Sequence, residues 1–372
     1  YLLQGKTDRE RMRYRPEGFY AENGCKTLFG KTAVRLDPNK KRVDLDDGTA
    51  VPYDRLLVAT GSSPFLPPME GIEKVKKRFS FMSLDDAEAL EDALFPEARV
   101  LVVGAGLIGL KCAEGICVRV DGITVVDLAP RILSSILDEK GALLVQEHLE
   151  RQGLAFRLGT SVRRFTENAA ELASGEMLEF DLLVTAVGVR PNVALVKDAG
   201  GETDRGIIVD EQMTTTLPDI YAAGDCVESV DLSCGTRRVL AILPNAYTGG
   251  YAAGLAMAGG TPVPLKAMPM NAIGFFGLHI LTAGSYAGKA YTESSGGSYK
   301  KLFYADDRLN GFIMIGEVDK AGIYTALIRE GTPLSAIDFP LICAQPSLIA
   351  LGRNYRAAKL GGEKGVELSV TF

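Results

Sequence analysis

The stretch Arg99-Val100-Leu101-Val102-Val103-Gly104-Ala105-Gly106-Leu107-Ile108-Gly109 decides the fold class. Residues 100–103 are an apolar run of the kind found in strands that a parallel sheet buries on both faces. The run leads directly into a G-x-G-x-x-G turn, and a helix to about Val118 and a strand over 123–126 follow. A strand, a glycine-rich turn, a helix and a strand in about 30 residues form a βαβ unit. The sequence therefore predicts a Rossmann-like dinucleotide-binding domain.

Each residue of this turn has a physical task in such a domain. Gly104 permits the tight turn, and Gly106 lets backbone N–H groups approach a pyrophosphate. Gly109 allows the helix to pack closely on the strand. Leu107 and Ile108 begin the helix, whose N-terminus carries a partial positive charge that favours phosphate. The triplet alone is weak evidence, and the strand before it and the helix after it make it specific.

An acidic residue stands where the ribose of a dinucleotide is expected. Asp127 ends the second strand, 23 residues after Gly104 (127 − 104). Its carboxylate can accept both hydroxyls of an adenosine ribose and would repel a 2′-phosphate. Leu128 rather than Arg follows, so NADH is favoured over NADPH. The alternative is that Asp127 is an ordinary solvated carboxylate at a strand end.

Two similar strand-end turns flank this unit. Ala59-Thr60-Gly61 follows the apolar run 56–58, and Gly224-Asp225 follows the run 220–223. Each is an ordinary turn by itself. A carboxylate at the tip of a buried strand can instead bind the hydroxyls of an extended polyol. Because the two turns bracket a complete nucleotide unit, we expect one domain that another interrupts.

The rest of the chain completes the expected α/β architecture of two Rossmann-like dinucleotide-binding domains, one inserted in the other. The first domain would occupy 1–95 and 217–264, the inserted domain 96–216, and a C-terminal α+β dimerisation domain 265–372. Helices are predicted from Ser83 to Leu94 and over 138–152, 244–258 and 319–330. Strands are predicted over 33–36, 42–45, 273–276, 299–303 and 311–315. We expect a linker at 214–218 and a proline-rich segment at 62–68 that continues neither a strand nor a helix.

Composition excludes several classes of protein. The chain has 372 residues, a hydrophobic fraction of 47% and a net charge of −6, which is ordinary for a globular protein and unfavourable for binding nucleic acid. No run of 18 apolar residues occurs, so we expect no membrane span. The six cysteines follow no metal-ligand spacing, and scattered thiols indicate a reducing, cytoplasmic location. Metal sites are not expected.

The order of these motifs resembles that of the pyridine nucleotide–disulfide oxidoreductase superfamily. The similarity covers nearly the whole chain. Residues 243–250, 256–259 and 316–322 are similar to its NADH oxidase, rubredoxin reductase and nitrite reductase flavoprotein branch. The motifs that carry the resemblance are Ala59-Thr60-Gly61, the Gly104–Gly109 turn, Ala186-Val187-Gly188-Val189-Arg190-Pro191-Asn192 and Gly224-Asp225.

This resemblance implies FAD held by the interrupted domain, NADH held by the inserted one, and hydride transfer from NADH to the flavin. By analogy Asp225 binds the ribityl chain next to Gly224, Thr60 and Gly61 lie near FAD, and Gly188 closes over the NADH side. Residues such as Phe275 and Phe276 would wall the flavin, and the C-terminal domain would form a homodimer.

Three departures from the family pattern bear on the prediction. Tyr1 aligns after the family's opening βαβ unit, so we expect the chain to begin within a domain. Lys111 stands where the family usually places a Glu near the nicotinamide, so that contact is not carried over. An exposed helix lysine is the alternative for it. Neither His148, expected on a polar helix face, nor His279, expected as a packed side chain, precedes a proline, which disfavours the glutathione reductase branch.

The sequence thus predicts an NADH-dependent FAD oxidoreductase, with no catalytic residue assigned. Its acceptor would be a rubredoxin- or iron–sulfur-type protein, dioxygen or a disulfide, and the residues do not choose among them. Cys226 and Cys234 are a conceivable redox pair, whereas Cys112 and Cys117 are expected to act as small apolar side chains. Two alternatives stay open: a flavin-free nucleotide-binding module, and a subunit of a larger flavoprotein complex.

Overall fold

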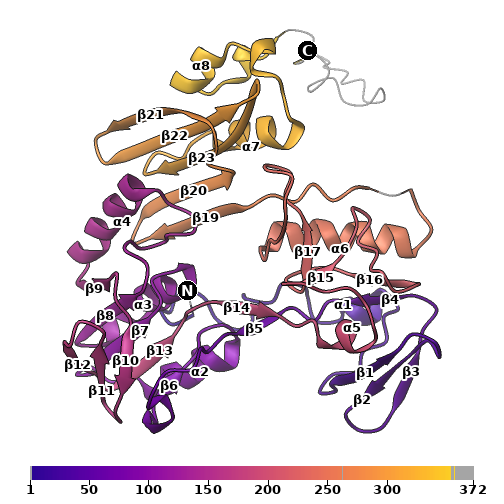
Figure 1. The fold of residues 1–372 in the computed structure, drawn as a ribbon, viewed down its shortest axis with the longest axis horizontal. Helices are drawn as coiled ribbons and strands as arrows, with labels where there is room; N and C mark the ends of the chain where they lie inside the picture. Colours follow the sequence, from indigo (N-terminus) through magenta and orange to yellow (C-terminus); the bar gives the residue numbers. More distant parts are fainter. Residues whose placement is uncertain (1, 262, 353–355, 357–372) are drawn as a thin grey trace, which may run out of the picture. The chain divides into compact units, whose positions relative to one another are not determined.

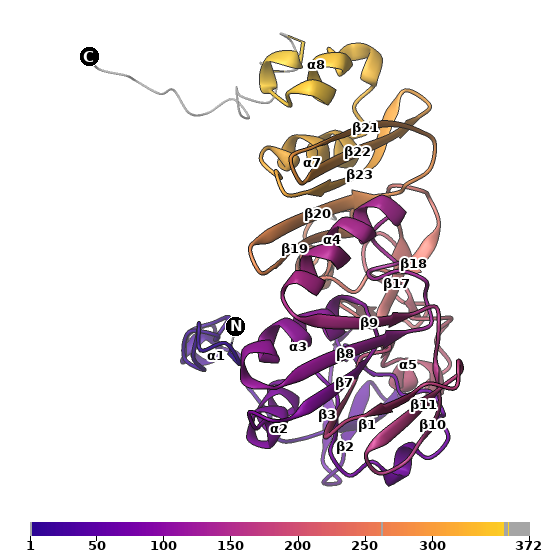
Figure 2. The ribbon, with the colours of Figure 1, turned by 90° about the vertical axis from the view of Figure 1, so that its left-hand side faces the viewer.

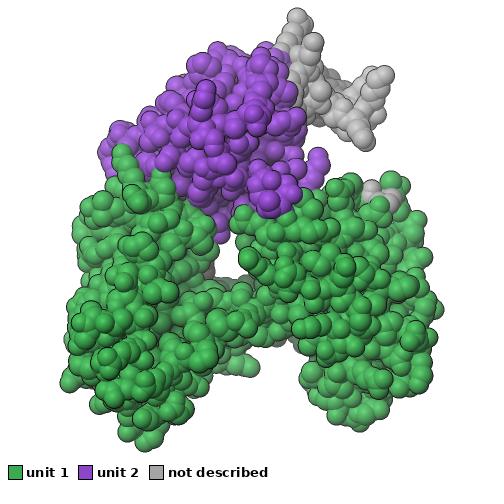
Figure 3. Space-filling model, viewed as in Figure 1, with its two compact units in different colours: residues 1–230, 237–265, 275–277 green, residues 231–236, 266–274, 278–372 purple. Residues whose placement is uncertain are grey.

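The computed structural model describes residues 2–261, 263–352 and 356. They divide into two compact units, coloured separately in Figure 3. Unit 1 comprises 1–230, 237–265 and 275–277, and unit 2 comprises 231–236, 266–274 and 278–372. The chain therefore passes between the units more than once.

A parallel sheet in unit 1 carries the glycine-rich turn. Its strand order is β6-β13-β7-β8-β9, and β7 pairs in parallel with both β8 and β13. Figure 2 shows β7, β8 and β9 side by side. Val100 to Val103 are all buried, as predicted for a central strand. Its strands are β6 (Arg78–Phe79), β7 (Arg99–Val103), β8 (Gly122–Asp127), β9 (Leu154–Leu158) and β13 (Leu182–Thr185).

Three helices of unit 1 begin close to the predicted residues. α2 (Leu84–Ala93) starts at Ser83, which forms a capping box with Asp86. α3 (Leu107–Ile116) follows the glycine turn and ends in a short 3₁₀ segment over 117–119. α4 (Glu139–Arg151) begins at Asp138, whose side chain accepts the N–H of Gly141.

Segments far apart in the sequence form a second parallel pair in unit 1. β4 (Leu56–Val58) pairs with β16 (Ile220–Ala222), and Ile220 lies opposite Leu56. Residues 59–219 therefore leave this sheet after β4 and return to it at β16, as one domain inserted in another requires. α6 (Leu243–Met257) contacts β16 and contributes Ala252 and Ala253 to the same core.

Shorter elements complete unit 1 (Figure 1). β5 (Ser62–Pro64) pairs with β14 (Val189–Pro191) where the chain crosses between the two parallel sheets. The remaining elements are α1 (Phe19–Glu22), β1 (Ala33–Asp37), β2 (Arg42–Leu45), β3 (Ala50–Pro52), β10 (Val162–Phe165), β11 (Ala169–Leu172), β12 (Met177–Glu179), α5 (Ala194–Asp198), β15 (Ile207–Ile208), β17 (Val227–Val230) and β18 (Arg237–Val239).

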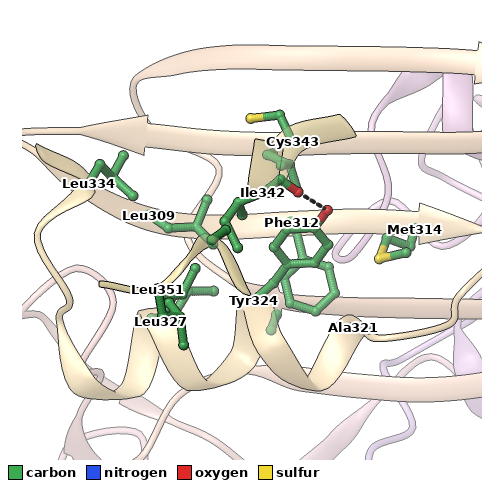
Figure 4. Packing of buried hydrophobic residues seen from close by; sticks show 14 of the residues in the cluster. Leu309, Phe312, Met314, Ala321, Tyr324, Leu327, Leu334, Ile342, Cys343 and Leu351 are labelled. Atoms are coloured by element: carbon green, nitrogen blue, oxygen red, sulfur yellow. Dashed lines mark hydrogen bonds between the residues drawn. The ribbon is translucent and has the colours of Figure 1, made fainter. Parts of the chain in front are cut away.

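Unit 2 is built on an antiparallel sheet in the order β19-β20-β23-β22-β21. α7 (Ala321–Glu330) covers it, and Tyr324 of α7 packs on Phe312 and donates to the carbonyl of Ile342 (Figure 4). The strands are β19 (Met270–Phe275), β20 (Leu278–Gly284), β21 (Lys289–Ser295), β22 (Ser298–Ala305) and β23 (Arg308–Ile315), and α8 (Phe339–Ala344) follows α7.

Three local predictions are wrong. The proline-rich segment 62–68 contains β5, because a strand in a two-stranded pair can place a proline where no ladder N–H is needed. The expected linker 214–218 is a packed turn, in which the N–H and hydroxyl of Thr215 both donate to Ile220. His279 is exposed on β20 rather than packed, since it lies on the strand face opposite the buried Ile280 and Thr282.

Candidate functional site

The glycine turn leaves no room for a side chain at two of its glycines and is open at the third. A Cβ at Gly104 would lie 2.2 Å from the carbonyl oxygen of Ala186, and φ there is +117°. A Cβ at Gly109 would lie 2.0 Å from the carbonyl oxygen of Gly104, so neither position admits a side chain. A Cβ at Gly106 would meet nothing within 4 Å. The open side at Gly106 is the approach that a pyrophosphate needs.

The start of α3 supplies the electrostatics of this turn. Gly106 is the residue before the helix, and Leu107 and Ile108 form its half-buried first turn. The first N–H groups of a helix have no partner within it and carry the positive end of the helix dipole. This end of α3 therefore favours an anion at the open side of Gly106.

Asp127 is positioned at the turn from the end of β8. One carboxylate oxygen accepts the N–H of Ala105 at 2.6 Å, and the other accepts the N–H of Ala129 at 2.8 Å. The side chain is half-buried, while Leu128 is 74% exposed. Each oxygen keeps a lone pair, because a carboxylate accepts more than one hydrogen bond per oxygen. The residues thus fit a dinucleotide with an unphosphorylated ribose.

Gly188 lies on the segment that borders this turn. The residues just before it, Ala186 and Val187, are the ones that a Cβ at Gly104 would meet. Gly188 itself is exposed, and its carbonyl accepts the N–H of Phe65 at 2.9 Å. The structure therefore places Gly188 between the glycine turn and the β5–β14 crossing.

A second group of predicted residues gathers at that crossing. Asp225, just after β16 and Gly224, accepts a hydrogen bond from Ser62 at 3.3 Å. Thr60, next to Gly61, donates to the carbonyl of Asn192 at 2.7 Å. The Asp225 carboxylate is half-buried and keeps capacity to accept hydroxyl groups. This arrangement fits the polyol chain of a flavin nucleotide.

The predicted residues thus form two groups, both within unit 1. The motifs did not single out Ser62 or Asn192 as site residues. Ser62 belongs to the segment predicted to be irregular, and Asn192 ends the motif 186–192 with no role assigned. The Pro-Asn sequence at 191–192, a turn signal, is the hint that the sequence offered.

Lys111 lies in a charged contact that the sequence did not predict. Its ammonium forms an ion pair with Glu114, a buried residue one turn further along α3, and lies 5.3 Å from the centre of the Phe275 ring. Glu114 also accepts the N–H of Phe276 at 2.7 Å. Lys111 is therefore half-buried and paired rather than an exposed helix lysine.

Residues 275 and 276, which Lys111 and Glu114 contact from α3, are also contacted from α4. His148 contacts the carbonyl of Phe275 at 3.0 Å, so the expectation that it lies on a polar face is wrong. Its ring also lies 6.5 Å from the ring of Phe276, centre to centre, so this position of α4 faces the 275–277 segment. The ring of Phe275 is fully buried. The role of Phe275 and Phe276 as a flavin wall stays a prediction.

No disulfide joins any of the six cysteines in the described structure, and the conceivable Cys226–Cys234 redox pair stays a prediction. All six are free thiols, and Cys226 is buried with its sulfur against the carbonyls of Ala223 and Val58. Cys112 is buried, as predicted for a small apolar side chain. No group of metal-ligating side chains converges in the described residues, and no helix among them is long and apolar enough to span a membrane.

Comparison with known proteins identifies the family. The model of the pyridine nucleotide-disulphide oxidoreductases matches residues 2–250, so the chain belongs to this family. Its members bind FAD and NADH, and this chain is an enzyme of that kind, an NADH-dependent flavin oxidoreductase.

Individual relatives agree. The phenylglyoxylate dehydrogenase (NADH-dependent) subunit epsilon of Aromatoleum evansii is 32% identical, over 95% of this chain and 86% of that protein. The rubredoxin-NAD(+) reductase of Pseudomonas putida is 32% identical, over 73% of this chain and 74% of that one. The assimilatory nitrate reductase electron transfer subunit of Bacillus subtilis is 31% identical over 88% of this chain, which spans 43% of its length.

Solved structures show the same fold. The crystal structure of a covalent putidaredoxin reductase–putidaredoxin complex matches with a TM-score of 0.86 and 24% identity, over 97% of this chain and 88% of that chain. This likeness confirms the architecture of two Rossmann-like domains.

Proposed function

We propose that this protein oxidises NADH through a bound FAD and passes the electrons to a small iron–sulfur protein. The observation that carries the proposal is a pair of strand-end turns in one compact unit, each of which fits a nucleotide. One is the open glycine turn with Asp127, and the other is the β4–β16 strand end with Asp225. A hydride donor and a hydride acceptor both need such a site.

Named residues take separate parts in this proposal. Gly104, Gly106 and Gly109, with Leu107 and Ile108, would bind the pyrophosphate of NADH. When bound, FAD supplies the conversion of a two-electron hydride into single electrons.

The remaining predicted residues hold and orient the two nucleotides. Asp127 would bind the adenosine ribose of NADH, and Asp225 the ribityl hydroxyls of FAD. Thr60, Gly61 and Gly224 would shape the FAD side, and Gly188 would border the NADH side.

The relatives support one kind of acceptor. They include a rubredoxin reductase and an electron transfer subunit, and one structural match is a reductase joined to putidaredoxin. These relatives favour an iron–sulfur-type protein as the electron acceptor.

The relative named as an epsilon subunit supports a second proposal about assembly. The chain would work as the NADH-oxidising subunit of a larger complex, with the iron–sulfur acceptor on another polypeptide. Co-purification of a tagged chain from its native cells with an iron–sulfur protein is the expected result. Isolation of the chain without any partner would contradict it. The domain boundaries at 95, 216 and 264 and the homodimer likewise remain proposals.

The decisive experiment measures flavin and acceptor together. We expect a yellow protein whose flavin absorbance bleaches when NADH is added without oxygen. Rubredoxin or a two-iron ferredoxin should then be reduced faster than dioxygen or a disulfide reagent. A colourless protein that still binds NADH would support the flavin-free module instead. Asp225→Ala should lower flavin occupancy, and unchanged occupancy would refute its assignment.

A further inference from the structure

Asn192 occupies the point where the two parallel sheets of unit 1 are joined. It directly follows β14, whose Pro191 lies opposite Ser62 and whose Arg190 lies opposite Ser63 of β5. The residues just before β5 are Thr60 and Gly61, which follow β4. Asn192 therefore lies beside the turn that the proposed function assigns to FAD.

Four hydrogen bonds connect Asn192 to this turn. Its backbone N–H donates to the carbonyl of Gly61 at 2.9 Å, and its carbonyl accepts the hydroxyl of Thr60 at 2.7 Å. Its side-chain Nδ2 donates to the carbonyl of Thr60 at 2.8 Å. Its Oδ1 accepts the hydroxyl of Ser63 at 2.8 Å. Asn192 is thus hydrogen-bonded to three of the four residues 60–63, namely Thr60, Gly61 and Ser63.

The chemistry of the side chain suits this task. A carbonyl can only accept, so the group that faces the oxygen of Thr60 must be the NH₂ of the amide. The amide oxygen is then left for the hydroxyl of Ser63. An aspartate would lack the donor, and an alanine would lack both groups. A short side chain with a donor and an acceptor at its tip is needed here.

The Thr60–Ser63 turn also contacts Asp225, the residue that the proposed function assigns to the ribityl chain of FAD. Ser62, between Gly61 and Ser63, donates to the Asp225 carboxylate at 3.3 Å. Asp225 and Ser62 are both half-buried. Fixing the backbone on either side of Ser62 limits where its hydroxyl can reach, and the bond from this hydroxyl favours one orientation of the Asp225 carboxylate.

We propose that Asn192 is a positioning residue that aligns the Thr60–Ser63 turn and, through Ser62, the carboxylate of Asp225 for flavin binding. This inference rests on the proposed function, because it assigns flavin to that turn. Asn192 acts through other residues, so we do not place it among the groups that touch the reacting atoms.

A purely structural role makes a different prediction, and the crossing offers a control for it. The guanidinium of Arg190 lies 3.7 Å from the centre of the Phe65 ring, which also ties β14 to the segment after β5. Arg190→Gln would loosen the strand pair without touching the hydrogen bonds of Thr60 or Ser63. If Asn192 only stabilises the crossing, both variants should behave alike.

The experiment compares dissociation constants of the deflavinated full chain for FAD and for NADH. We expect Asn192→Ala to weaken FAD binding about tenfold, the loss of roughly two net hydrogen bonds. Its affinity for NADH should stay within about twofold of the wild type, as should both affinities of Arg190→Gln. Ser63→Ala should weaken FAD binding less, because it removes one of the bonds. The visible absorption band of bound FAD should shift in Asn192→Ala. It should stay as in the wild type in Arg190→Gln.

Wild-type FAD affinity and an unshifted flavin band in Asn192→Ala would overturn the inference. Equal weakening by Asn192→Ala and Arg190→Gln would overturn it too. Should Asn192→Ala fail to fold by circular dichroism, Ser63→Ala decides, and wild-type FAD affinity in that variant counts against the proposal. Failure of the proposed function shows separately, as a wild-type protein that neither binds FAD nor is reduced by NADH.

Discussion

Asp127 combines two tasks in one side chain. Its carboxylate fixes the backbone at Ala105 within the glycine turn and lies where the ribose of a dinucleotide is expected. We predict that Asp127→Ala weakens NADH binding about 10- to 100-fold, the range for lost charge-assisted hydrogen bonds. The affinity for NADPH should fall less, since the variant has no carboxylate to repel the 2′-phosphate of NADPH. Dissociation constants for both nucleotides check this.

Asp121 offers the matched control for this substitution. It is an exposed carboxylate just before the same strand β8, and its backbone N–H donates to Ala98. Asp121→Ala removes an equal charge and keeps that bond, so both nucleotide affinities should stay unchanged. An Asp127→Ala protein with the wild-type ratio of NADH to NADPH affinity would refute the ribose assignment.

The thiols of the chain differ in reactivity because they differ in burial. Burial raises the pKa of Cys112 to about 12, whereas Cys25 and Cys234 are exposed. A raised pKa keeps the thiol protonated, and the thiolate is the reactive form. We predict that iodoacetamide at pH 8 labels Cys25 and Cys234 in the native protein and labels Cys112 only after unfolding. Peptide mass mapping measures this, and rapid native labelling of Cys112 would contradict it.

At the scale of elements, α2 tests how one cap stabilises a helix. Asp86 accepts the N–H groups of Ser83 and Met82 and the hydroxyl of Ser80. Partial burial opposes the charge, but these bonds and the Ser83 hydroxyl together hold the pKa of Asp86 below its ordinary value. A depressed folded-state pKa adds stability above the unfolded value of about 3.9 that is lost as the pH falls.

We therefore predict that Asp86→Asn lowers the free energy of opening of α2 by about 1 kcal/mol at pH 7. Its amides should also lose less protection than those of the wild type between about pH 5 and pH 3. Hydrogen exchange of α2 measures both quantities. Asp85→Asn, an exposed neighbour in the same helical turn, is the control for the helix dipole. Equal effects of the two substitutions would show that the cap bonds contribute nothing.

The elements that the sequence predicted share one property, which is a strong local signal. β7 is a continuous apolar run, the start of α2 carries its cap, and the glycine turn needs residues without a Cβ. β5 was missed because its structure depends on a distant partner, since Ser63 lies opposite Arg190. Such a pairing has no pattern in the local sequence. The 214–218 turn is a local structure, in which Thr215 bonds to Ile220, and the prediction of a linker overlooked that a threonine can close such a turn with its hydroxyl.

The residues of the candidate site likewise divide into those that the sequence predicted and those that it missed. Gly104 and Asp127 were found because a fixed spacing connects them. Asn192 and Ser62 were not, since their role comes from hydrogen bonds that span more than 100 residues. Lys111 was recognised as a departure from the family, but its partner Glu114 was not, because a buried carboxylate bonded to the backbone of Phe276 leaves no mark in the sequence. Spacing reveals residues near a turn, and tertiary contacts reveal the rest.

At the scale of the whole molecule, the two units have separate hydrophobic cores. The core of unit 2 includes Phe312, Tyr324 and Ile342, and the cores of unit 1 include Phe165 and Val58. All of the residues assigned to the nucleotides belong to unit 1. Stability of unit 2 and affinity for NADH should therefore be separable properties.

Phe312→Ala tests this separation. Phe312 is 1% exposed and packs on Tyr324 at 5.7 Å between ring centres, so its truncation should cost unit 2 about 3–5 kcal/mol of unfolding free energy. Hydrogen exchange resolved by segment should show faster exchange in β22, β23 and α7, with an unchanged dissociation constant for NADH. Phe165→Ala is the matched substitution in unit 1, where Phe165 is fully buried and packs edge-on against Phe180. It should weaken NADH binding and leave the exchange of unit 2 as in the wild type. Loss of NADH affinity in Phe312→Ala equal to that in Phe165→Ala would mean that the two cores act as one.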